Sequence, residues 1–77
     1  KKHDEENQTQ YMETLRVYLE QHLSATQAAR ELFIHRSTFL YRLDRIKEIL
    51  QSELDDPEEI FYLELSFRLL EQEQEKE

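Results

Sequence analysis

The stretch AARELFIHRSTFLYRLDRI, residues 28–46, contains the strongest structural pattern in the chain. Two small residues, Ala28 and Ala29, precede an apolar run at residues 32–34, and a polar run, His-Arg-Ser-Thr, follows directly. Apolar residues then recur at positions 39, 43, 46 and 50, which is the spacing of one buried helix face. The pattern predicts two helices joined by a short turn, with the paired alanines where the helices cross.

A short helix, a turn of about three residues and a second helix together are typical of a helix-turn-helix. The second helix of this motif enters the DNA major groove and presents its N-terminal residues to base edges. Arginine pairs bidentately with guanine, and serine and threonine bond base edges or phosphates. The polar run therefore predicts a DNA-reading surface. The candidate DNA-binding residues are His35, Arg36, Ser37, Thr38, Tyr41 and Arg42.

The flanking sequence is predicted to be helical as well. Apolar residues at helical spacing predict a first amphipathic helix over residues 9–22. The sequence SATQ at residues 24–27 is a capping box that starts the short second helix. In DDPEEI, residues 55–60, Asp56 can cap a fourth helix and Pro57 suits its first position. The predicted fold class is all-α, a four-helix bundle containing a helix-turn-helix.

The predicted DNA-binding domain occupies residues 9–71. Residues 1–8 contain no apolar side chain and are expected to form a disordered lead-in or linker, and residues 72–77 an acidic frayed tail. A chain of 77 residues leaves little room for a catalytic cleft, and no nucleophile–base pair or phosphate loop can be assembled. We therefore expect no enzyme, no catalytic residue and no cofactor.

Charge is distributed unevenly along the chain. The net charge of -8 argues against general affinity for nucleic acid. Residues 30–48 nevertheless carry five basic and three acidic residues, a local charge of +2. This segment indicates where an anionic partner would sit. No cysteine is present and the three histidines share no ligand spacing, so no metal site is expected, and no apolar run approaches the ~18 residues of a membrane span.

Residues 28–46 also resemble a known family. They look like the C-terminal helix-turn-helix of PucR/CdaR-type bacterial regulators, whose pattern runs roughly A-x-x-L-F/H-I/V-H-R-N-T-L-x-Y-R-L-x-x-I. The resemblance extends over residues 12–70. It implies a Fis-like helix-turn-helix that is the sequence-specific DNA-binding domain of a bacterial transcriptional regulator. It implies double-stranded DNA as the partner and a cytoplasmic location at the bacterial nucleoid.

The chain departs from the family pattern at two positions. Ser37 stands where Asn is common, and Leu40 where Arg is frequent, so one hydrogen-bonding side chain is shortened and one contact is lost. Phe33 lies where many helix-turn-helix proteins have Gly, and a bulky residue at positive φ is costly. The resemblance implies that Phe33 is usual in this family.

Other roles are open for the candidate residues. His35 can bond its own backbone, Arg36 and Arg42 can form surface ion pairs, and Tyr41 suits the edge of the core as well as a phosphate. Three further residues are candidate phosphate contacts: Thr26, Gln27 and Arg45. Gln27 also serves the capping box, and Arg45 fits a solvated face.

A rival interpretation is a non-enzymatic helical module for protein–protein interaction or dimerisation. The last predicted helix carries a wide apolar stripe, at residues 60, 61, 63, 65, 67, 69 and 70, which exceeds what one neighbouring helix covers. The stripe either lies at the centre of the core or pairs with another copy. We expect a homodimer in the full-length protein, because two-fold symmetry matches two DNA half-sites.

Overall fold

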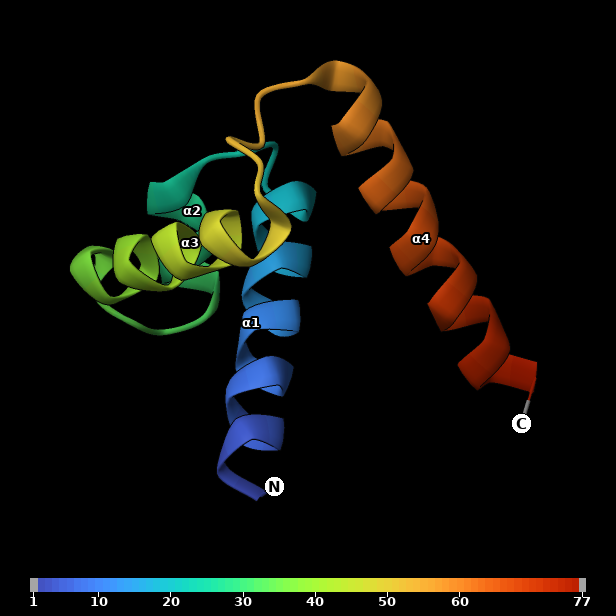
Figure 1. The fold of residues 1–77 in the computed structure, drawn as a ribbon, viewed down its shortest axis with the longest axis horizontal. Coiled ribbons are helices and arrows are strands. Elements are labelled where there is room, and N and C mark those ends of the chain that lie inside the picture. Colours follow the sequence, from blue (N-terminus) through green and yellow to red (C-terminus); the bar gives the residue numbers. More distant parts are fainter. Residues whose placement is uncertain (1, 77) are drawn as a thin grey trace.

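The structure, a computed structural model, consists of four helices (Figure 1). It describes the backbone of residues 2–76 and the side chains of residues 8–73. The helices are α1 (Lys2–Glu20), α2 (Ala25–Glu31), α3 (Arg36–Leu50) and α4 (Pro57–Lys76). No strand occurs in residues 2–76, so the predicted all-α class is confirmed. None of the described helices has the length and apolar character needed to cross a membrane.

Two helices extend past their predicted bounds. The backbone of α1 is helical from Lys2 rather than from Thr9, and it therefore includes residues 2–8, where the sequence predicts a disordered lead-in. The backbone of α4 continues to Lys76, through the segment expected to fray. Neither extension contains a glycine or proline, so no residue type stops the helix there. The limits of the functional domain, residues 9–71, stay a prediction.

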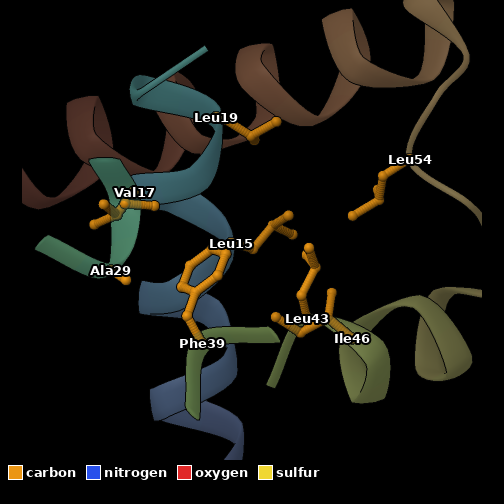
Figure 2. Close-up of a cluster of buried hydrophobic side chains, with 9 residues drawn as sticks. Leu15, Val17, Leu19, Ala29, Phe39, Leu43, Ile46 and Leu54 are labelled. Carbon is orange, nitrogen blue, oxygen red and sulfur yellow. The ribbon is translucent and has the colours of Figure 1, made fainter. Parts of the chain in front are cut away.

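The core lies where α3 crosses α1, with α2 packed on both helices (Figures 1 and 2). Phe39 is fully buried, and its ring centroid lies 5.7 Å from that of Tyr18 on α1. Ala28 and Ala29 are buried, which confirms the predicted close crossing. The buried apolar side chains are Leu15, Val17, Leu19, Ala28, Ala29, Phe39, Leu43, Ile46 and Leu54.

The linker between α3 and α4 is fixed by a buried leucine. Leu54 inserts into the core beside Leu15 and Ile46 (Figure 2). Ser52 Oγ accepts a hydrogen bond from the Leu54 N–H at 2.9 Å and donates one to the Glu59 carboxylate. Asp56 Oδ1 accepts from the Glu58 N–H at 3.1 Å, so the predicted cap of α4 is confirmed. These contacts fix where α4 begins relative to the core.

Three helices end in a left-handed residue although the chain contains no glycine. His22, Phe33 and Gln51 have φ values of 57°, 59° and 53°. After each helix, two N–H groups return to helical carbonyl groups in the Schellman pattern, as in Ser52 N–H to Lys47 O at 3.1 Å. A non-glycine residue in this conformation costs roughly 1–2 kcal/mol.

Gln51→Gly is expected to stabilise the protein. Glycine relieves the left-handed strain, which raises the free energy of unfolding. It also adds entropy to the unfolded chain, which offsets part of this gain, so the net rise should be about 0.5–1 kcal/mol. Urea denaturation measures the change. Gln10→Gly, in the interior of α1 where the backbone is helical, is the control and should instead lose about 1 kcal/mol. A loss of stability in Gln51→Gly would contradict the left-handed turn.

Candidate nucleic-acid interface

The first helix of the motif, α2, begins with the predicted cap. Ser24 Oγ accepts a hydrogen bond from the Gln27 N–H at 3.2 Å. The reciprocal bond of a capping box is not formed, because the Ser24 N–H donates to the carbonyl of Gln21 at 3.2 Å. The side chains of Thr26 and Gln27 are exposed at this end of α2.

The turn between α2 and α3 is closed by backbone hydrogen bonds. The Ile34 N–H donates to Ala29 O and the Phe33 N–H to Arg30 O, both at 3.1 Å. Phe33 occupies the left-handed position, and its side chain is 93% exposed. The turn therefore directs Phe33 outward and returns Ile34 to the edge of the core.

The N-terminal turn of α3 gathers the predicted polar cluster. His35 caps the helix with its backbone, its carbonyl accepting from the Phe39 N–H at 3.0 Å, and its side chain forms no capping hydrogen bond. Arg36, Ser37 and Thr38 are exposed around the free N–H groups of this turn. Such a turn attracts anions, because its N–H groups point outward and the helix dipole is positive there.

The rest of α3 holds this end in place. Phe39, Leu43 and Ile46 are buried on one side of the helix, whereas Tyr41 is exposed on the other. The N-terminal end of α3 points away from α4 (Figure 1), and the side chains of residues 35–38 are exposed. A rigid helix thus presents a polar end to solvent.

Arg42 lies in a different environment from Arg36. Its side chain is partly buried, and Nη1 donates to Thr14 Oγ1 on α1 at 3.5 Å. Thr14 is fully buried, so its hydroxyl group needs a hydrogen-bond partner within the protein, and Arg42 supplies one. Thr14 is not among the predicted site residues, although a polar residue on the apolar face of α1 is a signal that the sequence contains.

The Arg42–Thr14 contact should be measurable as a coupling energy. In a double-mutant cycle of Arg42→Met and Thr14→Val, the interaction term in the free energy of unfolding is expected to be about 0.5–1.5 kcal/mol. The exposed pair Arg45–Glu48, with Nη1 to Oε1 at 2.9 Å, is the control and should give less than about 0.5 kcal/mol. Equal coupling in the two cycles would contradict the structural role of Arg42.

The arginines differ in how far acidic neighbours neutralise them. Arg16 on α1 bonds Glu13 at 2.6 Å and Glu20 at 2.7 Å, and the hydrogen bond to Glu13 is the main cause that raises the pKa of its guanidinium. Arg45 is paired with Glu48. Among the described residues Arg36 makes no ion pair, so its charge stays available at the start of α3.

The fold and this exposed polar helix end define a helix-turn-helix DNA-binding domain. The PucR C-terminal helix-turn-helix domain family matches residues 11–69, and the chain belongs to that family. It is therefore the helix-turn-helix domain of a PucR-family transcriptional regulator, with double-stranded DNA as its partner. The resemblance seen in residues 12–70 is confirmed.

Two curated relatives match the chain. It is 41% identical over 58 residues to the purine catabolism regulatory protein of Bacillus subtilis (strain 168), covering 75% of this chain and 11% of that protein. It is 40% identical over 53 residues to the proline-responsive transcriptional activator PutR of the same strain, covering 69% of this chain and 13% of that protein. The chain thus spans a small fraction of the length of these relatives. No solved structure gives a significant match.

Proposed function

We propose that the chain reads a specific DNA sequence in the major groove with the N-terminal turn of α3. Arg36 approaches guanine, with His35, Ser37 and Thr38 beside it on base edges or the nearest phosphates. The observation that carries the proposal is the exposed Arg36, which makes no ion pair with any described side chain, on a helix anchored by the buried Phe39.

The flanking candidates contact the DNA backbone in this proposal. Tyr41 is exposed on the open side of α3, and Thr26 and Gln27 are exposed at the start of α2, the helix that crosses the backbone in this motif. Arg42 approaches from the α1 side, where Thr14 holds it. Arg45 would exchange its bond to Glu48 for a phosphate.

The acidic remainder of the chain restricts how DNA docks. Outside residues 30–48 the net charge is -10, which repels phosphates from the other faces. Wrong docking modes are disfavoured by this repulsion, and selectivity increases at the expense of general affinity.

The full-length protein is, in the same proposal, a homodimer that binds two half-sites in the bacterial cytoplasm. Helix-turn-helix dimers place their reading helices about one DNA turn apart, so each copy contacts one half-site. One relative is named as a regulatory protein and the other as a transcriptional activator, which supports a non-catalytic role for this chain.

Selection from random duplexes, followed by fluorescence-anisotropy titration, tests the proposal. We expect a preferred sequence to emerge and its affinity to fall about 40-fold between 50 and 200 mM salt for roughly three phosphate contacts. A shuffled duplex of equal length is the control. If no duplex binds even at low salt, the chain is instead a protein–protein interaction module.

A further inference from the structure

The helix α4 is apolar on two opposite sides. Its inner side packs on the core through Ile60, Leu63 and Phe67, and α1 is the only helix it contacts in the described structure (Figure 1). At about 100° per residue, a second apolar stripe falls on the opposite side. We call this stripe the outer seam: Phe61, Tyr62, Leu65 and Leu69, exposed by 60%, 66%, 42% and 54%.

The outer seam has the pattern of a helix-pairing surface. Tyr62, Leu65 and Leu69 follow the three-and-four spacing that places side chains along one line of contact between helices. The acidic Glu64 and Glu71 lie on the side of α4 that faces Arg16 of α1, so they do not interrupt the seam. A helix that is apolar on two opposite sides buries both of them when each side is covered, and here only the inner side is covered.

The charges on α4 favour a second α4 in the antiparallel direction. With Leu65 on a two-fold axis, Phe61 opposes Leu69 and Tyr62 opposes Arg68. Arg68 lies between the outer seam and the hollow that it lines with Glu64 and Glu71, and from this border its long side chain can reach the Tyr62 ring of the other copy in a cation–π arrangement. Glu58 then opposes the uncharged Gln72. In a parallel pair Glu58, Arg68 and Glu73 would each meet their own copies, which is repulsive.

We infer that a second copy of this chain covers the outer seam, so that two α4 helices pack antiparallel about Leu65. This inference rests on the proposed homodimer and names its interface. The arrangement leaves the N-terminal end of α3 free, because that end lies on the far side of α1 from α4 (Figure 1).

Cysteine cross-linking tests both the face and the direction, since the chain has no cysteine of its own. Leu65→Cys should form a disulfide-linked dimer on mild oxidation, because the two residues meet at the axis. Leu69→Cys is the matched control: antiparallel pairing separates its two copies by about 12 Å along the helices, beyond disulfide reach. We expect at least about tenfold more linked dimer from Leu65→Cys. Equal linking of the two variants indicates parallel pairing and overturns the inference, as does no linking of either.

Sedimentation equilibrium supplies a second readout that does not depend on a disulfide. Leu65→Glu should reduce the chain to the 9.5 kDa monomer, with helical content unchanged in circular dichroism because Leu65 lies on the surface. Ile49→Glu, on an apolar residue of α3 that is more exposed than Leu65, should remain dimeric. The reverse pattern would place the dimer contact on α3 and exclude the outer seam.

Titration of the Leu65→Glu monomer with a single half-site duplex separates this inference from the proposed function. Binding by the monomer, with cooperative binding to two half-sites lost, supports both. A cross-linked dimer that binds no duplex overturns the proposed function and leaves the interface intact. A wild-type chain that is monomeric and still reads DNA overturns the interface alone.

Discussion

Arg36→Ala is expected to weaken binding to the preferred duplex by about 1–3 kcal/mol, roughly 5- to 150-fold. Arg36 is the first residue of α3, it is exposed, and it forms no ion pair among the described residues. A bidentate pair with guanine is lost with the guanidinium, and alanine offers no replacement. Anisotropy titrations against the preferred duplex and its single-base variants measure the loss and assign it to one position.

The pattern of loss decides what Arg36 contacts. Relaxed specificity at one base pair indicates guanine, whereas an equal loss for all sequences indicates a phosphate. Arg16→Ala is the control, because Arg16 is already neutralised by Glu13 and Glu20, and its effect on DNA affinity should be small. An unchanged affinity in Arg36→Ala would contradict the assignment of the polar cluster.

Phe39→Ala is expected to lower the free energy of unfolding by about 3–5 kcal/mol. The ring is fully buried where α3 crosses α1, and a domain of this size has little stability to lose. Urea denaturation and circular dichroism should show a largely unfolded chain at moderate temperature. DNA binding should disappear with the fold.

Phe33→Ala makes the same chemical change at an exposed position six residues earlier. Its side chain is 93% exposed, so the free energy of unfolding should change by less than about 0.5 kcal/mol. If the two variants were equally stable, Phe39 would not be the centre of the core.

Much of the fold was predictable because strong local signals agreed. The apolar spacing at 39, 43 and 46 matches the buried side of α3, and the caps at Ser24 and Asp56 begin helices as expected. These signals depend on residues within one or two turns of each other, so the sequence alone contains them. The same helical spacing also predicted that the first turn of α3 presents polar side chains to solvent.

Other features depend on contacts between distant residues. Leu54 is a single apolar residue in a polar linker, so no periodicity marks it, yet it is buried in the core. The hydrogen bond from Arg42 to Thr14 joins α3 to α1 across the fold. The left-handed turn at Phe33 contains no glycine, so no residue type in the sequence indicates it. The wide stripe on α4 exceeds what one neighbouring helix covers, but the sequence left open whether the stripe lies at the centre of the core or pairs with another copy.

In the proposed function, the N-terminal turn of α3 reads DNA. Titration of the isotopically labelled chain with the selected duplex, followed by amide chemical shifts in NMR spectra, tests this contact. We expect the largest shifts at residues 35–42 and smaller ones at residues 26 and 27, with α4 nearly unchanged when the chain is already dimeric. Shifts concentrated on α4, with residues 35–42 unaffected, would contradict it.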